Sequence, residues 1–578
     1  MVQRLLTIIL SGENRKVAEG LNDWDMQSPT AISQAKRTEH TTDSLFLGNS
    51  FCHISLEAGI VVIRAFYFVK RRSLRQLPKK EKNGRDIWAK TVRERRKREE
   101  KMDKFNEILG HINDFAWGVP MLCLIMGTGI LLTVRMGGLQ FRKLGLALRL
   151  TVRNEDGGEG EVSSFGALCT ALAATIGTGN IVGVAGAMMA GGPGALFWMF
   201  VAACLGMATK YAEGLLAVKY RTIDDKGTAL GGPFLYIEKG MGRKWRWLAK
   251  LFAIFGIGAG LLGIGTMTQV NGIAVAVQNY FDPEKANIAF SIGDTSYTWA
   301  TVISAAVVTL AVALVVIGGI QRIAGVTTIV VPFMAILYVG VCIAILVTNA
   351  SEIPGAFASI FRSAFGLDAV AGGTMGALFI AMQKGVARGV FSNEAGLGSA
   401  PIAAAAAKTK EPVRQGLITM TGTFIDTIIV CMMTGLTILV TNSLSTAADK
   451  NIEGAEITAN AFGEGLPWSE SAGSFVLMLC LTFFAFTTIL GWDYYSERCL
   501  AYLTKGSISA QKTFKWLYVL AVLAGPFLTV SAVWTIAEIL NGFMAIPNLI
   551  GLLALNGVVV AETKSFFKRL KEDPSLIK

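Results

Sequence analysis

Residues 165–180 read FGALCTALAATIGTGN, an apolar segment whose last six residues are rich in glycine, threonine and asparagine. The segment lies in a charge-free stretch, 162–209, which is long enough for two membrane helices with a GGPG turn at 191–194 between them. Gly177 and Gly179 allow a helix to unwind at low steric cost. Unwinding bares main-chain carbonyls and amides, which a membrane tolerates only where they line a cavity. Such groups coordinate cations and hold carboxylates in transporters, although a small-residue face for helix packing is an alternative interpretation.

The composition agrees with a membrane protein. Charged residues make up 17% of the 578 residues and hydrophobic residues 52%, whereas soluble domains carry about 25% charged residues. The net charge of +12 would suggest nucleic acid only if the apolar runs were ignored. We therefore expect a lipid bilayer as partner and no nucleic acid.

Eleven apolar runs are expected to cross the membrane, which predicts an all-α polytopic membrane protein. They are 115–134, two runs within 162–209, 251–281, 299–318, 323–347, a run from about 371 to 384, 415–440, 472–492, 516–533 and 535–560.

Lysine and arginine mark alternate loops, and cytoplasmic loops are the ones enriched in these residues. Lys285, Arg362 and Lys450 each stand alone in their loops. The C-terminus is therefore expected in the cytoplasm, and the residues just before the first span outside. The basic loops are 135–153, 221–246, 408–414 and 498–515, followed by the basic tail, 563–578.

The basic N-terminal extension, 1–101, conflicts with that orientation because its end, 70–101, would lie outside. Three interpretations are open: a disordered cytoplasmic tail, an amphipathic surface helix near 56–69, or translation that begins at Met102. Only the third removes the conflict.

A second interrupted segment starts with Gly372 and Gly373 and continues to Ser399. Two glycine-broken segments that open the two halves of a chain indicate an inverted-repeat transporter. Lys384 and Arg388 in this segment are expected near its cytoplasmic end. The expected organisation is a first helix and basic loop at 102–164, a first repeat at 165–348 and a second repeat at 371–562.

Further polar groups interrupt the apolar runs. Thr487 and Thr488 are adjacent hydroxyls that suit a small cation, unless each bonds its own helix carbonyl one turn back. Gln269 and Asn271 form an uncharged polar pair that lines a pathway or joins helices.

Only two acidic residues are expected at membrane depth, Asp426 and Glu538. Asp426 is a candidate for coupling, and Glu538 is expected at the outer boundary. The three histidines, His40, His53 and His111, all precede the first span, so no histidine relay crosses the membrane. This favours a metal cation over a proton as the coupling ion, while Asp426 keeps the proton alternative open.

Four strings resemble the alanine or glycine:cation symporter family. The resemblance covers about 102–570, and the last string is the most specific. It implies a prokaryotic protein of the cytoplasmic membrane with a leucine-transporter-type 5+5 inverted repeat after one extra helix. The strings are TALAATIGTGNI at 170–181, GGPGALFW at 191–198, GGPFLY at 231–236 and KGVARGVFSNEAGLGSAP at 384–401.

The resemblance also implies a site around a break at 176–180. A sodium site is expected from main-chain carbonyls and hydroxyls of Ala173, Ile176, Phe484, Thr487 and Thr488. The expected substrate-binding residues are Thr175, Gly177, Thr178, Gly179, Asn180, Gln269, Phe379, Met382, Gln383 and Trp492, with Phe379, Met382 and Trp492 as the walls of a small apolar pocket.

The sequence thus predicts sodium-coupled symport of alanine or glycine by alternating access, with no enzymatic activity and no cofactor besides sodium as coupling ion. Proton coupling is the nearest alternative. A channel would need filter loops or charged rings, and a membrane enzyme would need a catalytic pair at membrane depth; the sequence shows neither.

Overall fold

The computed structural model describes residues 104–577, with gaps at 105, 154, 156–157, 226, 293–294, 368–373, 451 and 528–529. The interpretations of 1–101 therefore concern residues outside the described part, and so does the expected role of Gly372 and Gly373.

Helices dominate the chain up to residue 364, and two short antiparallel hairpins are the strands among the described residues. The elements are α6 (Val119–Arg135), α7 (Leu139–Arg142), α8 (Leu144–Thr151), α9 (Ser164–Thr175), η1 (Thr178–Asn180), α10 (Val182–Gly191), α11 (Gly194–Tyr220), β1 (Thr222–Ile223), β2 (Ala229–Leu230), α12 (Pro233–Leu235), η2 (Tyr236–Gly240), η3 (Arg243–Trp245), α13 (Arg246–Leu262), α14 (Met267–Phe281), β3 (Ile288–Ile292), β4 (Thr295–Thr298), α15 (Trp299–Val316), α16 (Gly319–Thr348), η4 (Ala350–Glu352) and α17 (Ile353–Ala364).

All the elements in the rest of the described chain are helices. Its elements are α18 (Thr374–Asn393), α19 (Ala400–Ala404), α20 (Pro412–Thr423), η5 (Phe424–Cys431), α21 (Met432–Val440), α22 (Ser443–Lys450), α23 (Ala455–Glu464), α24 (Glu470–Leu503), α25 (Ile508–Ala524), η6 (Gly525–Phe527), α26 (Val530–Glu572) and η7 (Pro574–Ile577).

Within the described residues, eight helices are long and apolar enough to cross a membrane, or nine if one bent pair counts as a span. The protein is thus a helical, multi-pass membrane protein, as predicted. The eight are Asn106–Arg135, Gly194–Tyr220, Arg243–Phe281, Trp299–Val316, Gly319–Thr348, Pro412–Val440, Glu470–Leu503 and Thr535–Glu572, and the bent pair is Ser164–Thr175 with Thr178–Gly191.

Two of the eleven predicted spans are absent from that set for physical reasons. α18 carries Lys384 and Arg388, which lower its hydropathy. α25 has 17 residues, about 26 Å of helix at 1.5 Å per residue, which is shorter than a bilayer core of about 30 Å. Eleven spans therefore remain a prediction.

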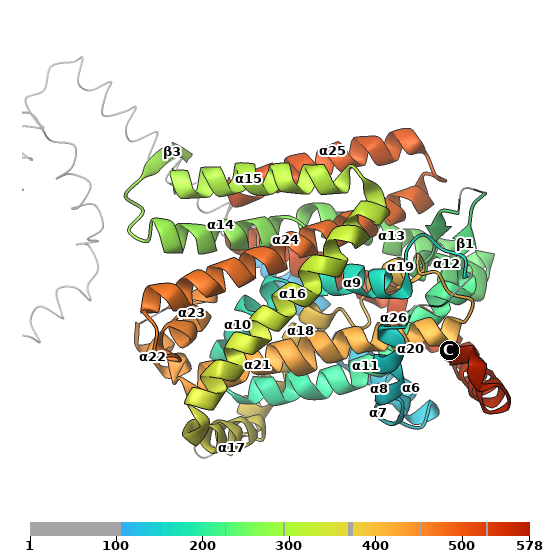
Figure 1. The fold of residues 1–578 in the computed structure, drawn as a ribbon, viewed down its shortest axis with the longest axis horizontal. Helices are drawn as coiled ribbons and strands as arrows, with labels where there is room; N and C mark the ends of the chain where they lie inside the picture. Colours follow the sequence, from blue (N-terminus) through green and yellow to red (C-terminus); the bar gives the residue numbers. More distant parts are fainter. Residues whose placement is uncertain are drawn as a thin grey trace, which may run out of the picture. The chain divides into compact units, whose positions relative to one another are not determined.

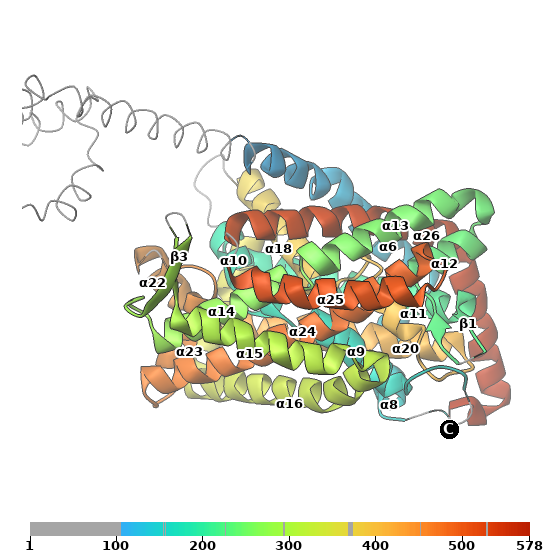
Figure 2. The ribbon, with the colours of Figure 1, turned by 90° about the horizontal axis from the view of Figure 1, so that it is seen from above.

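The helices surround a centre formed by α9 and α24. α24 packs against α9, α13, α14 and α16, while α11 packs against α18 and α20. Figure 1 shows α15 and α25 side by side on one flank and α11 with α20 and α21 on the opposite one. Figure 2 shows α13 and α26 side by side. The broken helix α9–η1–α10 therefore lies inside the bundle.

Candidate binding site at two helix breaks

The first break interrupts the segment that opens the charge-free stretch. α9 begins where the Ser163 hydroxyl accepts a hydrogen bond from Gly166 N (3.0 Å), and it ends because Ile176 turns to an extended conformation. Gly177 is also extended, and η1 follows it. The helix axis bends by 62° between Ser164–Thr175 and Thr178–Gly191. The Asn180 side-chain oxygen accepts from Gly177 N at 2.9 Å, which satisfies one freed amide. The predicted break is present.

A glutamine side chain braces the break from a neighbouring helix. Gln269 Oε1 accepts from Thr178 N at 3.1 Å, and Gln269 Nε2 donates to the Ile264 carbonyl at 3.0 Å. Ile264 lies in a gap between α13 and α14, so the predicted single span 251–281 is itself interrupted. Two irregular main-chain segments are thus linked by one buried amide.

Hydroxyls of α24 meet the end of α9. Thr487 and Thr488 both donate to the Phe484 carbonyl at 3.0 Å, which is the ordinary bond one turn back. Thr488 Oγ1 also lies 3.2 Å from the Ile176 carbonyl oxygen, across the helix boundary. Ala173 is fully buried one turn earlier on α9. Carbonyl and hydroxyl oxygens that suit sodium therefore gather here, and sodium binding stays a prediction.

Glycine is required at the contact between the break and α24. A Cβ on Gly177 would lie 2.6 Å from Thr488 Oγ1 and 3.0 Å from Gln269 Oε1. A Cβ on Gly179 would meet Phe391 and Ser392 at an ordinary 3.6 Å. The close approach of Gly177 is therefore what lets Thr488 reach the Ile176 carbonyl.

The second break follows α18 and precedes α19. Glu394, Gly396 and Gly398 have positive φ angles of 57°, 90° and 83°, a region that glycine adopts readily and glutamate rarely. The Ser399 hydroxyl donates to Glu394 Oε2 at 2.5 Å. Because the sequence carries glycines throughout this region, only the structure places the break at 394–399.

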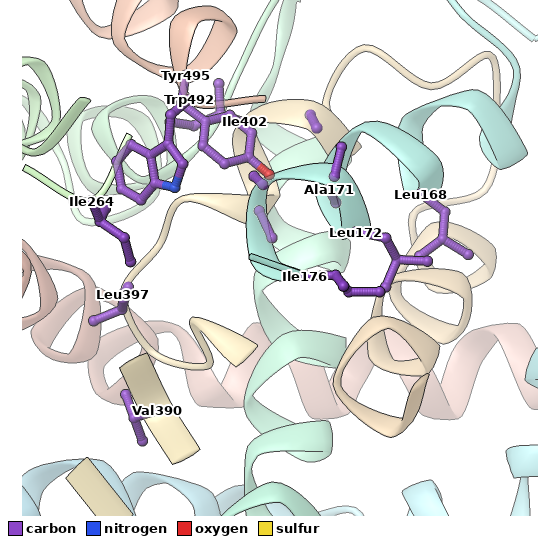
Figure 3. Close-up of a cluster of buried hydrophobic side chains, with 14 of the residues drawn as sticks. Leu168, Ala171, Leu172, Ile176, Ile264, Val390, Leu397, Ile402, Trp492 and Tyr495 are labelled. Carbon is purple, nitrogen blue, oxygen red and sulfur yellow. The ribbon is translucent and has the colours of Figure 1, made fainter. Parts of the chain in front are cut away.

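Trp492 of α24 faces this second break. Its Nε1 donates to Glu394 Oε1 at 2.9 Å, and its side chain is fully buried. Figure 3 shows the indole close to Ile264, with Tyr495 beside it; the centroids of the two aromatic rings are 5.6 Å apart. Trp492 therefore lies between the α13–α14 interruption and the second break.

Three predicted substrate residues are not brought to either break. Phe379 is 37% exposed, and Met382 and Gln383 are half-buried on α18. Gln383 lies ten residues before the end of α18 at Asn393, about 15 Å of helix. Two glycines of α18, Gly385 and Gly389, are helical and pack closely against α11: a Cβ on Gly385 would lie 2.2 Å from the Ala195 carbonyl oxygen. A role for these three residues stays a prediction.

Asp426 lies directly against the first break. Its Oδ1 accepts from Asn180 Nδ2 at 2.8 Å, and its Oδ2 accepts from Ser392 (2.9 Å) and Thr427 (2.7 Å). The Thr434 hydroxyl donates to the Asn180 carbonyl at 2.9 Å. All three partners of the carboxylate donate to it, an arrangement that suits the charged form.

A group of buried charged and amide side chains was not predicted from the sequence. Glu213 Oε1 accepts from Asn548 Nδ2 (2.6 Å) and from Gly396 N (3.1 Å), so α11 and α26 together hold the second break. Lys210 and Glu213 are buried, three residues apart on α11. The prediction ended this span at Thr209, just before that pair. The i, i+3 spacing of opposite charges on a continuing helix was the available signal.

Asp426 is not the only fully buried acidic residue of the described chain. Glu213, Glu394 and Asp493 are also fully buried, and Glu213 and Asp493 lie on helices long enough to span a membrane.

The expected positions of Arg388 and Glu538 cannot both hold. Arg388 Nη2 lies 2.7 Å from Glu538 Oε1, although the sequence predicted opposite membrane faces for them. The second break and α19 separate Arg388 from the basic residues of 408–414. One of the two expected membrane faces is therefore wrong, and Arg388 lies on the same side of the bundle as Glu538.

Comparison with known proteins identifies the family of the chain. The sodium:alanine symporter family model matches residues 102–577. An uncharacterized transporter of Haemophilus influenzae is 52% identical over 465 residues, covering 80% of this chain and 96% of the relative. The sodium/alanine symporter AgcS of Methanococcus maripaludis is 46% identical over 468 residues, covering 80% and 97%.

A third relative carries a different substrate in its name. The "Probable sodium/glutamine symporter GlnT" of Bacillus subtilis is 35% identical over 484 residues, covering 82% of this chain and 93% of the relative. Relatives of one family are thus named for amino acids of different size. The chain, a helical membrane protein with discontinuous central helices, belongs to the sodium:alanine symporter family of cation-coupled amino-acid symporters and is a transporter, not an enzyme.

Proposed function

We propose that the protein carries a small neutral amino acid, alanine or glycine, into the cell together with sodium by alternating access. The observation that carries this proposal is the contact of Thr488 Oγ1 with the Ile176 carbonyl across the break in α9–η1–α10. The contact brings a hydroxyl of α24 to a bared main-chain carbonyl at the end of α9, inside the bundle.

Sodium would replace hydrogen bonds at this place. The Ile176 and Phe484 carbonyls and the Thr487 and Thr488 hydroxyls are neutral hard oxygens, the ligand type that small hard cations prefer. Ala173 supplies a fifth oxygen if its carbonyl turns to the same point. An ion held by both α9 and α24 stabilises the arrangement in which those helices meet.

The substrate carboxylate and ammonium would meet the main chain and hydroxyls of Thr175 and 177–180. Thr178 N already bonds Gln269 Oε1, and the Thr178 hydroxyl is buried with no hydrogen-bond partner in the described structure. A buried hydroxyl without a partner is unfavourable by about 1–3 kcal/mol, and a polar ligand would relieve that cost. Gln269 would then exchange its main-chain partner for the ligand.

Trp492 would limit the size of the substrate's side chain. Its indole is fixed by Glu394, and the Cβ of the same side chain packs against Gly265, where an added Cβ would lie 2.5 Å away. A fixed wall of this size favours a methyl group or hydrogen on the substrate. The name of AgcS supports alanine, and that of GlnT makes glutamine the substrate to test against it.

Coupling follows from a difference in ion affinity between conformations. Sodium that joins α9 to α24 favours the state that binds substrate, and the membrane potential adds about 2.3 kcal/mol per charge per 100 mV. The two broken segments, α9–η1–α10 and α18–α19, support a 5+5 inverted repeat over 165–348 and 371–562. With α18 and α25 as the remaining spans there would be eleven crossings, so the two ends of 102–578 would lie on opposite faces, and the basic loops support a cytoplasmic C-terminus.

Proton coupling is the second candidate, because Asp426 directly contacts Asn180 of the break. Uptake of labelled alanine into proteoliposomes, with sodium and pH gradients imposed separately, distinguishes the two. We expect uptake with an inward sodium gradient at equal pH, inhibited by glycine more than by glutamine. Uptake driven by pH alone would replace sodium by the proton, and stronger inhibition by glutamine would replace the substrate.

A further inference from the structure

A small cavity of about 80 Å³ lies between α18, α26 and the helical residues before α6. Its lining carries both signs of charge: Arg388 and Lys384 are basic, and Glu538 and Asp114 are acidic. Asp114 and Lys384 are exposed, while Arg388 and Glu538 are partly buried. A cavity with both signs of charge matches a ligand that itself carries both.

The two partly buried charges are held in place by neighbours. Glu538 Oε2 accepts from Asn113 Nδ2 at 2.7 Å, and Trp117 Nε1 donates to the Glu538 carbonyl at 2.9 Å. The Arg388 guanidinium lies over the Phe391 ring, 5.5 Å from its centroid. The carboxylate and the guanidinium are thus preorganised by different groups, in addition to their own 2.7 Å ion pair.

The cavity lies one side-chain layer from the first break. Phe391 lines it, and a Cβ on Gly179 would meet the Phe391 ring at 3.6 Å. The next residue, Ser392, bonds Asp426 beside Asn180. A solute in the cavity would be separated from the proposed substrate site by the Phe391 ring.

We propose that this cavity is a vestibule site for a small zwitterionic amino acid on its way to the break, an inference that rests on the proposed function. Arg388 takes the carboxylate and Glu538 takes the ammonium, so one ion pair is exchanged for two. The side chains of Arg388 and Glu538 are 31% and 16% exposed, so water partly screens the attraction between them. The pair therefore opens at little cost, and a local excess of substrate speeds association.

An ion pair that acts only as a closed gate gives the opposite prediction. If the Arg388–Glu538 pair only closed the route, its removal would leave the route open and substrate would associate faster. If the cavity binds the zwitterion, removal of either charge slows association. The direction of change in the association rate therefore decides between the two roles.

The test measures the association rate and equilibrium Kd of labelled alanine at saturating sodium, by rapid filtration on the purified full-length protein. Arg388→Gln and Glu538→Gln are each expected to lower the association rate by about three- to tenfold. The Kd should stay within about twofold, since the vestibule speeds passage in both directions. Arg149→Gln, an exposed change on α8, should alter neither quantity.

A double variant separates charge from shape. Arg388→Glu combined with Glu538→Arg keeps both charges and should recover at least half the wild-type rate, whereas the double glutamine variant should not. Association at the wild-type rate or faster in the single variants overturns the vestibule site. Wild-type protein that shows no sodium-dependent binding contradicts the proposed function itself, and an unchanged Kd confirms that each variant is folded.

Discussion

Trp492 Nε1 donates a 2.9 Å hydrogen bond to Glu394 Oε1, and this bond joins α24 to the break between α18 and α19. Glu394 also accepts from Ser399 on the far side of the same break. Trp492, the proposed wall of the substrate pocket, is therefore bonded to the segment between α18 and α19. This segment would change its conformation most if α18 and α19 moved relative to each other.

Replacing Trp492 by alanine should widen the accepted substrate towards valine and leucine, because the buried indole is removed. Alanine uptake itself should fall, since Glu394 Oε1 loses its donor and a buried unsatisfied acceptor costs about 1–3 kcal/mol. Competition of unlabelled valine and leucine with labelled alanine in proteoliposomes measures the change. Trp299→Ala, at an exposed tryptophan that begins α15, is the control. Transport that persists with unchanged selectivity would remove Trp492 from the pocket wall.

Thr488→Ala should raise the sodium concentration needed for half-maximal uptake by about five- to thirtyfold, because one oxygen worth about 1–2 kcal/mol is lost. The matched control is Thr482→Ala on the same helix, whose hydroxyl bonds the Met478 carbonyl of α24. Thr488→Ser, which keeps the oxygen, should restore the sodium dependence. An unchanged sodium dependence in Thr488→Ala would exclude α24 from the ion site.

The place of the first break was predictable from sequence, whereas for the second the sequence predicted an interrupted segment but not where in it the helix breaks. Around Gly177 polar and small residues interrupt an apolar run, so the sequence distinguishes the break from the helix on either side. After residue 384, glycines recur at 385, 389, 396 and 398. The first two permit close helix packing, while the last two have positive φ angles. Composition alone cannot distinguish a glycine that packs helices from a glycine that breaks one. The roles expected of Phe379, Met382 and Gln383 depend on this distinction, because they assume a break close to these residues.

Buried charged residues were the other feature that the sequence did not predict. An apolar run ends at its first charged residue, so the sequence predicts a helix that ends before Lys210 and Glu213. In the structure α11 includes both residues. α11 continues because Glu213 finds donors at Asn548 and Gly396, more than 180 residues away in sequence. Partners that distant cannot be inferred from a single chain.

Asp426→Asn should lower sodium-driven uptake by about tenfold or more, because charge-assisted hydrogen bonds contribute about 1.5–3 kcal/mol and Asn180 loses its anionic partner. Initial uptake rates under a sodium gradient at equal pH give the measurement. Asp449→Asn, an exposed change in α22, should leave the rate unaltered. A variant that keeps its uptake but loses a pH dependence present in the wild type would assign Asp426 to proton coupling instead.

Gly177→Ala tests the role of the first break most directly. The added Cβ would lie 2.6 Å from Thr488 Oγ1 and 3.0 Å from Gln269 Oε1, so it pushes apart the two side chains that brace the break. Uptake should fall by about tenfold to a hundredfold, since overpacking costs about 1–3 kcal/mol. Gly183→Ala on α10 is the matched control, because a Cβ there has no described atom within 4 Å. Both variants should elute as single peaks in size-exclusion chromatography, so that the difference reports the site and not folding. Equal uptake by the two variants would mean that substrate and sodium bind away from the break in α9–η1–α10.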